Sequence, residues 1–417
     1  MRIVKLTPAV ERKLLRARQE HDGEAQRIAS RIISDIRLRG DAALSAWVKK
    51  LDGIDLQREG LWISEREIRD ARRQVSRDFL HALEHAAHNV RRVAEKQSPK
   101  PWTMEVEPGV KIGQIVRPID SIGCYIPGGR FALVSTMVMT VVPARVAGVR
   151  NIQVVSPRPN AALLAAAGVL GVTRLARMGG AQAIAALAYG TKRVARVDKI
   201  FGPGNRFVTT AKQLVSSDCA IDLPAGPTEA IVLATTGNPR WIAADLLAQA
   251  EHAPDAGSFL VTTSSSLARQ VQTEVARQLL QLAPTNPAQI SMKRKGAILL
   301  APSLHTACEF VNRFAPEHLS LPGDGAALLK KIHAAGTVFL GPWGAQPLGD
   351  YASGSNHVQP TGGWARMRGG LSTADFVKCI SVQSIGRTGF TRLAADVQTL
   401  ARVEGLLAHA NAVEVRR

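Results

Sequence analysis

The chain has 417 residues, 46% hydrophobic and 21% charged, a balance typical of a globular protein of two or three domains. It contains no run of ~18 apolar residues and begins without an apolar signal segment, so we expect a cytoplasmic protein without a membrane partner. The formal net charge of +19 is compatible with nucleic-acid binding, but no zinc-finger spacing or aromatic RNA-binding motif accompanies it, and we expect no nucleic-acid partner.

The first part of the chain is predicted to be helical. Residues 8–50 and 64–97 carry apolar side chains at helical spacing. Gly40 is expected to end one helix, Asp41 to cap the next, and Ser64 to be the N-cap of the second stretch. Four cysteines without CxxC spacing, Cys124, Cys219, Cys308 and Cys379, indicate reduced structural thiols rather than a metal–thiolate cluster.

From about residue 110, short apolar runs alternate with helical segments, which predicts parallel sheets covered by helices. The fold class expected is α/β, with two Rossmann-like parallel-sheet units, one inserted in the other, and helical N-terminal and C-terminal segments. The expected domains are residues 1–118 with 228–370, a nested dinucleotide-binding domain at 119–227, and a helical tail at 371–417, placed at a dimer interface. The predicted strands are 121–126, 152–155, 174–178 and 197–200 in the nested unit, and 230–234, 258–263, 297–300 and 338–340 in the other.

Glycine turns directly follow three of these strands, although GxGxxG and GxxxxGK[ST] are absent. Ligands of open α/β sheets collect at the carboxyl ends of strands, and the next helix start can hold a phosphate. Each turn alone is ordinary turn chemistry, but three in one unit favour a dinucleotide cleft. The turns are Pro127-Gly128-Gly129, Gly179-Gly180-Ala181-Gln182 and Gly202-Pro203-Gly204-Asn205.

A carboxylate and an imidazole, Glu317 and His318, stand side by side after Pro316. The proline predicts a turn or a helix start there. A histidine can take and return protons near neutral pH, and the glutamate can activate water. Alone, such a pair is more often a solvated surface feature.

Two further groups suggest a metal site. Gln249 and His252 lie three residues apart on a predicted helix from 239 to 252, so their side chains share one face. Alone, such a pair is more often a polar helix end. Asp350, in a loop of small residues, is a candidate third ligand. His409, close to the end of the chain, would usually face solvent.

Taken in order, the motifs of this chain resemble those of histidinol dehydrogenases, and the resemblance covers nearly its whole length. The motifs are the three glycine turns, Ala225-Gly226-Pro227-Thr228-Glu229, Gln249-Ala250-Glu251-His252, Pro316-Glu317-His318-Leu319, Gly349-Asp350-Tyr351-Ala352 and Ala408-His409. The family is a zinc-dependent and NAD-dependent homodimer with shared active sites. It oxidises L-histidinol through the aldehyde to L-histidine, the last steps of histidine biosynthesis.

The resemblance implies a role for each matching residue. Glu317 and His318 would be catalytic, and Zn²⁺ would be held by Gln249, His252, Asp350 and His409. NAD would contact Tyr125, Gln182 and Asn205. The substrate would contact Thr228, Gln249, His252, His318, Asp350, Glu404 and His409. In the family, Glu404 and His409 reach the active site of the other subunit.

Two departures and two alternatives remain. Thr228 stands where many relatives have serine, which keeps the hydroxyl, and residues 130–136 depart from a common lysine and proline pattern, which affects the cofactor contacts beside Tyr125. A paralogue such as a sulfopropanediol dehydrogenase would have the same fold and metal but another substrate. A basic nucleic-acid-binding protein with a degenerate enzyme fold is the alternative from another class, and the intact Glu317–His318 pair argues against it.

Overall fold

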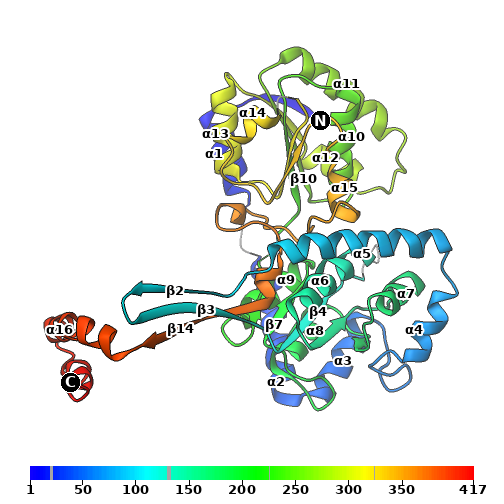
Figure 1. The fold of residues 1–417 in the computed structure, drawn as a ribbon. Coiled ribbons are helices and arrows are strands. Elements are labelled where there is room, and N and C mark those ends of the chain that lie inside the picture. The colour runs from blue at the N-terminus through cyan, green and yellow to red at the C-terminus, as the bar shows by residue number, and fades with distance from the viewer. Residues whose placement is uncertain (19–21, 129–132, 225, 324) are drawn as a thin grey trace.

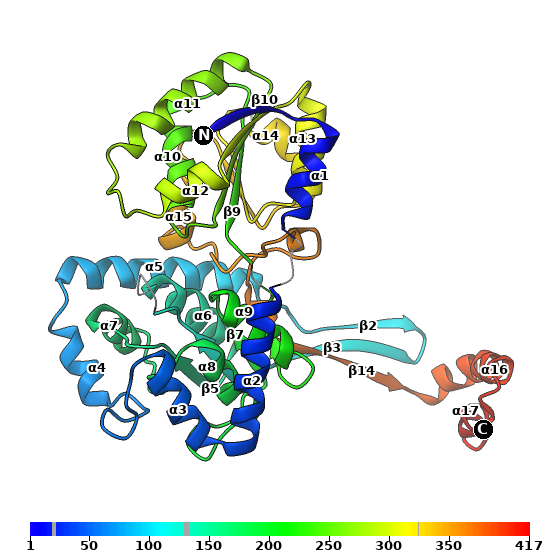
Figure 2. The same ribbon diagram turned by 180° about the vertical axis from the view of Figure 1, so that it is seen from behind.

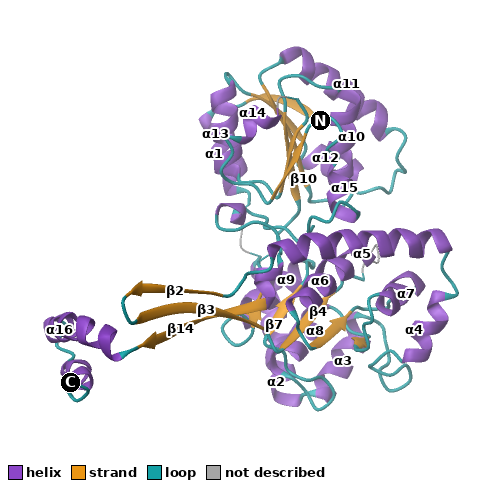
Figure 3. Ribbon diagram, viewed as in Figure 1, coloured by secondary structure: helices purple, strands orange, loops and turns teal. Residues whose placement is uncertain are grey.

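The computed structural model describes residues 1–18, 22–128, 133–224, 226–323 and 325–417. Figure 1 shows two bodies, each built around a sheet with helices on its faces, and a long arm that leaves the lower body and ends in the C-terminus. Figure 2 shows the same arrangement from behind, and Figure 3 separates helices from strands. None of the helices in the described part of the chain is both long and apolar enough to cross a membrane.

The upper body holds a six-stranded parallel sheet in the order β1-β11-β10-β9-β12-β13. Apolar side chains of this sheet pack on helices on both of its faces. Its strands are β1 (Arg2–Lys5), β9 (Glu229–Leu233), β10 (Gly257–Thr262), β11 (Ala297–Leu300), β12 (His318–Leu321) and β13 (Thr337–Leu340), and its helices are α1 (Pro8–Arg16), α10 (Pro239–Ala250), α11 (Ser265–Leu279), α12 (Ala288–Arg294), α13 (Leu304–Phe314), α14 (Gly325–Leu329) and α15 (Gln346–Tyr351).

The lower body holds a five-stranded parallel sheet in the order β6-β5-β4-β7-β8. Because its strands lie between β1 and β9 in the sequence, one parallel-sheet unit is inserted in the other, and the predicted α/β fold class is confirmed. Its strands are β4 (Ser121–Tyr125), β5 (Asn151–Val155), β6 (Leu175–Ala176), β7 (Lys199–Phe201) and β8 (Ala220–Ile221), and its inserted helices are α6 (Val134–Ala147), α7 (Ala161–Val169), α8 (Gly180–Tyr189) and α9 (Arg206–Val215).

Helices α2 to α5 pack on the lower body. Side chains of α2 (Gly23–Arg39) and α3 (Asp41–Leu51) share a hydrophobic core with α8 and α9. Leu83 and Val90 of α5 (Arg77–Gln97) pack with α6, and α4 (Glu65–Arg72) contacts α7. These contacts differ from the sequence-based grouping of residues 1–118 with the upper sheet, which receives only β1 and α1 from this stretch among the described residues.

Most of the predicted helix ends have the expected caps. Gly40 ends α2 with φ +55°, and Ser64 caps α4 through a capping box with Glu67. Asp41 is the first residue of α3 rather than its cap, because Gly40 occupies the cap position. Helix α6 continues through Pro143 to Ala147.

The arm is an antiparallel sheet in the order β14-β3-β2, which carries two helices at its tip (Figure 1). The prediction of a mostly helical tail from residue 371 was therefore wrong for β14, which pairs with β3 along its whole length. That pairing partner lies more than 250 residues earlier in the chain, so local periodicity could not reveal it. The elements are β2 (Trp102–Glu107), β3 (Val110–Pro118), β14 (Val377–Ile385), α16 (Arg387–Val403) and α17 (Leu407–Glu414).

Candidate active site

Glu317 and His318 lie at the amino end of the upper sheet, facing the lower body. Helix α13 ends at Ala315, which has a left-handed conformation (φ +49°), and Pro316 then leads into β12, whose first residue is His318. The predicted turn is confirmed, but the chain enters a strand and not a helix. Because β12 pairs with β9, with His318 opposite Ala230, Thr228 at the entrance to β9 lies beside the catalytic candidates.

The carboxylate of Glu317 accepts two hydrogen bonds, both on the same oxygen. Oε2 accepts hydrogen bonds from the Thr228 hydroxyl and, at 2.9 Å, from the backbone N–H of Glu229. The residue is only 6% exposed, and this burial raises the pKa of Glu317 although His318 and the two donors oppose the change. A carboxylate whose pKa lies above its usual value can act as a base toward water near neutral pH.

His318 stands between two carboxylates. Its Nδ1 lies 3.8 Å from Glu317 Oε2, and its Nε2 lies 3.5 Å from Asp350 Oδ1. Burial disfavours the imidazolium, but the charges of Glu317 and Asp350 outweigh burial, so the pKa of His318 is raised. Burial also disfavours the charged form of Asp350, but bonding to His318 lowers the pKa of this carboxyl below its usual value.

Three of the predicted metal ligands converge beside His318. Gln249 is in the last turn of α10, which ends at Ala250, so His252 lies just past the helix rather than within it. The Nδ1 atom of His252 is 3.1 Å from the Ala248 carbonyl; donation to this oxygen leaves Nε2 with the lone pair that a metal needs. Asp350 is 7% exposed, and the positive charge that His252 can carry helps to lower the pKa of Asp350.

These donors suit zinc, which accepts imidazole nitrogen and carboxylate or carbonyl oxygen. The amide of Gln249 is oriented by two bonds: its Nε2 donates to the Thr228 hydroxyl at 2.6 Å, and its Oε1 accepts from Gln346 Nε2 at 2.5 Å. Within the described part of the chain, no group of three or more His, Cys, Asp and Glu side chains could hold a metal ion. One chain brings together an amide, an imidazole and a carboxylate of the predicted ligand set, and His409 is the member that lies elsewhere.

Glu404 and His409 are not brought to this cluster within the chain. Glu404 caps the end of α16, His409 lies in α17, and both side chains are exposed. The two helices pack on each other at the tip of the arm, away from both sheets (Figures 1 and 2).

The predicted cofactor residues lie at the end of a strand of the lower sheet or at the start of one of its helices. Asn205 caps α9 by accepting from the N–H groups of Phe207 and Val208. Tyr125 and Gln182 are buried behind the surface, where the Tyr125 hydroxyl accepts from Gly180 N at 3.2 Å. Burial raises the pKa of Tyr125 to about 12, so the phenol stays protonated. The departure noted at residues 130–136 falls partly on residues 130–132, which lie outside the described residues.

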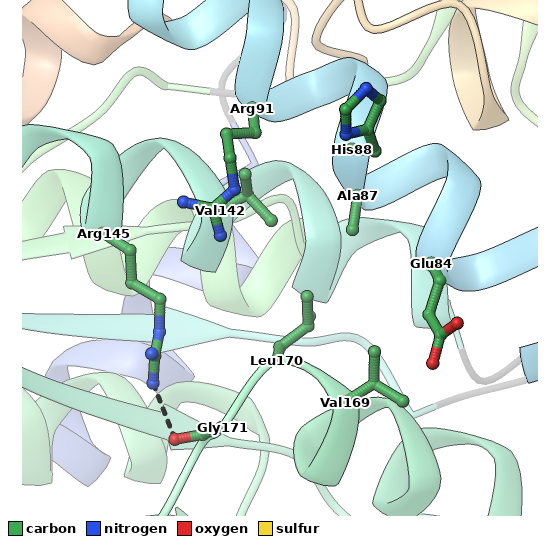
Figure 4. Close-up of a pocket in the computed structure, with 9 residues that line it drawn as sticks. All are labelled: Glu84, Ala87, His88, Arg91, Val142, Arg145, Val169, Leu170 and Gly171. Atoms are coloured by element: carbon green, nitrogen blue, oxygen red, sulfur yellow. Dashed lines mark hydrogen bonds between the residues drawn. The ribbon is translucent and has the colours of Figure 1, made fainter.

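One cavity of about 1200 Å³ joins the two groups of predicted residues. Glu317, Thr228 and His252 line its upper part, and the loop from Pro203 to Asn205 lines its lower part. Gln249, His318 and Asp350 stand directly behind the first group through the contacts given above. A separate hollow of about 330 Å³ between α5 and α6 is lined by exposed side chains such as His88 and Arg145, and contains none of the predicted site residues (Figure 4).

Three residues of the site had no assigned role in the sequence-based prediction. Arg18 forms a buried ion pair with Glu229, and burial next to Glu317 raises the pKa of Glu229 to about 7. His357 lines the cavity, with Nδ1 2.8 Å from the Asp350 carbonyl. Asp350 lies in the short helix α15 and not in the predicted loop. His357 follows in the same polar stretch, which is the signal that could have identified it, whereas Arg18 lies in an unremarkable basic segment after α1.

Comparison with known proteins identifies the family. The family model described as histidinol dehydrogenase matches residues 15–417. The histidinol dehydrogenase of Aquifex aeolicus is 44% identical over 94% of this chain and 93% of its own, and that of Geobacter sulfurreducens is 44% identical over 96% and 95%. The crystal structure of histidinol dehydrogenase from Elizabethkingia anophelis superimposes with a TM-score of 0.94 at 37% identity, covering 100% of this chain and 98% of that one.

The match extends over both sheets, the arm and the tail, and it includes every element that contributes to the cavity. The chain therefore belongs to the histidinol dehydrogenase family of zinc-using and NAD-dependent oxidoreductases.

Proposed function

We propose that this protein is a histidinol dehydrogenase that converts L-histidinol through L-histidinal into L-histidine with two molecules of NAD. The observation that carries the proposal is the Glu317–His318 pair, which stands at one end of a cavity that reaches the glycine loop ending at Asn205. A base, a water activator and a loop suited to phosphate thus share one space in a member of this family.

His318 is the base in both oxidations. Removing hydride from an alcohol requires that the hydroxyl proton leave at the same time, and His318 takes this proton. The carboxylates of Glu317 and Asp350, at 3.8 Å and 3.5 Å from its two nitrogens, stabilise the imidazolium that results. NAD, when bound, supplies the hydride acceptor for each oxidation.

Glu317 acts between the two oxidations. The aldehyde carries no hydroxyl on its carbonyl carbon, so a water molecule has to add before a second hydride can leave. Because Thr228 and Glu229 occupy Oε2 of Glu317, its Oε1 is the atom that takes the proton from this water. The raised pKa of Glu317 makes the carboxylate a stronger base for that step.

Gln249, His252, Asp350 and His409 would hold zinc, and the metal would orient the amine and imidazole of L-histidinol. The hydrogen bonds from Gln249 to Thr228 and from Gln346 to Gln249 support this assignment, because they fix the amide before the metal arrives. The same four residues would also contact the substrate. The other proposed substrate contacts are Thr228, His318 and Glu404.

Asn205, Tyr125 and Gln182 are the proposed contacts of NAD. Asn205 lines the cavity at the start of α9, where the positive end of the helix dipole favours an anion. Gln182 lies in the first turn of α8, and Tyr125 is the last residue of β4, a strand of the same lower body.

We infer a homodimer in which each tail completes the site of the other subunit. Exposed apolar side chains gather on the arm and the tail, which is typical of a surface that another chain covers. They include Trp102 (48%), Met104 (54%), Ile380 (44%), Leu400 (63%), Val403 (82%) and Leu407 (70%). His409 is exposed on that tail, so it can act as the fourth zinc ligand in the site of the other subunit.

We also propose a division of the chain into three parts and a cytoplasmic location for the protein. The nested unit at 119–227, the surrounding unit at 1–118 and 228–370, and the tail from 371 follow the chain order, although α2–α5 pack on the nested unit. The four free cysteines suit a reducing compartment and support a cytoplasmic location. Supplying L-histidinol and NAD and following NADH formation tests the activity, and turnover of a different alcohol only would favour a paralogous function.

A further inference from the structure

A buried ion pair lies directly beneath the glycine loop that follows β7. Lys212 of α9 and Asp222, which follows β8, form this pair with side chains that are 3% and 0% exposed. Neither residue lines the cavity, whereas Pro203, Gly204 and Asn205 of the loop do. The pair therefore contacts the loop from the protein side, opposite the space that a ligand would fill.

Both polar groups of the Gly202 backbone bind this pair. The N–H of Gly202 donates to Asp222 Oδ2 at 2.7 Å, and its carbonyl accepts from Lys212 Nζ at 2.8 Å. Asp222 also accepts from the N–H of Leu223 at 2.6 Å, which fixes the carboxylate itself. The first residue of the loop is thus held at both of its hydrogen-bonding groups by side chains.

The loop has little freedom to adopt another position. Gly202 has φ +110°, a region that favours glycine, and a Cβ at this residue would lie 2.1 Å from the Tyr125 carbonyl oxygen. A Cβ at Gly204 would lie 2.3 Å from Val208 of α9. The backbone therefore packs against the end of β4 on one side and the first turn of α9 on the other.

Burying an ion pair in this space costs free energy. Removing two charges from water costs several kcal/mol for each ion, and an apolar pair of similar volume often gives equal or greater stability. What an apolar pair cannot do is bind both the N–H and the carbonyl of Gly202. The benefit of Lys212 and Asp222 consequently lies in the geometry of the loop.

We propose that Lys212 and Asp222 are positioning residues for the dinucleotide: by holding the Gly202 peptide, they fix the loop through Asn205 in the conformation that receives the pyrophosphate. The inference rests on the proposed function. Lys212 does not attract the phosphate directly. Asp222 neutralises the charge of Lys212, and the Lys212 ammonium group already donates to the Gly202 carbonyl and to Asp222. Losing the pair should therefore weaken the affinity for dinucleotide and spare the affinity for L-histidinol.

The decisive variant is Lys212→Met/Asp222→Leu, which removes both charges together and leaves no unpaired ion in the core. The dissociation constant of NADH, measured by fluorescence titration without substrate, should rise about tenfold to a hundredfold, by analogy with the loss of affinity when groups that orient a metal ligand are removed. The KM for L-histidinol should stay near the wild-type value, and the protein should remain folded although the N–H and the carbonyl of Gly202 lose their partners. A folded double variant that binds NADH as tightly as the wild type overturns the inference.

Two further variants serve as a control and as a replacement if the first variant does not fold. Lys199→Met is the matched control, since Lys199 is a partly buried lysine of β7 that donates to the Asp375 carbonyl at 2.8 Å and does not touch the loop; its NADH affinity should be unchanged. If leucine at 222 prevents folding, Lys212→Gln/Asp222→Asn replaces it, and unchanged affinity in that variant also contradicts the inference. A wild-type protein that binds no NADH at all contradicts the proposed function instead.

Discussion

The hydroxyl of Thr228 donates a hydrogen bond to Glu317 Oε2 and accepts one from Gln249 Nε2 at 2.6 Å. One hydroxyl thereby connects the proposed water activator with a proposed zinc ligand, although the residues come from three separate parts of the chain. The position of Glu317 and the orientation of the Gln249 amide are consequently coupled through Thr228.

Thr228→Val removes this connection without changing the size of the side chain. Glu317 loses a donor and Gln249 loses an acceptor, so we expect kcat for aldehyde oxidation to fall about tenfold or more, which corresponds to one lost hydrogen bond to a charged group. Thr228→Ser keeps the hydroxyl and should retain most of the activity. Steady-state rates with L-histidinal compare the two, and equal rates for Val and Ser would show that the hydroxyl has no such role.

Asp350→Asn tests the metal site. The substitution removes the carboxylate that would ligate zinc, so metal retention after dialysis should fall about tenfold or more, and chelation should abolish wild-type activity in a way that zinc reverses. Metal content by mass spectrometry and activity before and after chelation provide the measurement. Asp245→Asn, four residues before Gln249 in α10 but lining a different cavity, is the control for metal content. A metal-free preparation with full activity would refute the zinc assignment.

Asp245 also gives a prediction for stability against pH. Burial raises its pKa from 3.8 to about 6, so the folded protein binds a proton at this carboxyl more tightly than the unfolded chain does. No penalty exists below the unfolded pKa, and stability is lost as the pH rises from about 4 through 6. Asp245→Asn should therefore raise the free energy of unfolding by ~1–3 kcal/mol at pH 8 and by much less at pH 4.5. Urea unfolding at both pH values checks this, and an equal gain at both would contradict it.

The sharing of sites between subunits can be tested with mixed dimers. Glu317→Gln and His409→Asn should each be inactive alone, but co-expression should produce dimers with one intact site if the tail acts on the other subunit. Random pairing makes half of the dimers mixed, so about a quarter of wild-type activity should return. If the tail served its own subunit, every site would carry one lesion. No recovery, with mixed dimers present in the preparation, would remove Glu404 and His409 from the neighbouring site.

Local signals in the sequence predicted what depends on neighbouring residues. The N-cap Ser64, the glycine that ends α2, and the helix that brings Gln249 near His252 are all set by short-range chemistry. The regular alternation of strands and helices was sufficient for the two parallel sheets, because the central strands are buried on both faces and read as short apolar runs.

The remaining features depend on contacts between distant residues. The pairing of β14 with β3 overrides the helical pattern of the tail, and the packing of α2 on α8 and α9 determines which body receives the first helices. Arg18 reaches Glu229 across more than 200 residues, and Lys212 meets Asp222 only once β8 is beside β7. Neither pair has a local spacing that a reader of the sequence could recognise.

The number of NADH molecules formed for each L-histidinol consumed is the most direct test of the two-step oxidation. Purified enzyme with excess NAD and a limiting amount of L-histidinol should form two NADH and one L-histidine, with little free aldehyde, because Glu317 hydrates the intermediate within the cavity that holds it. One NADH for each L-histidinol, with L-histidinal released into solution, would contradict the account.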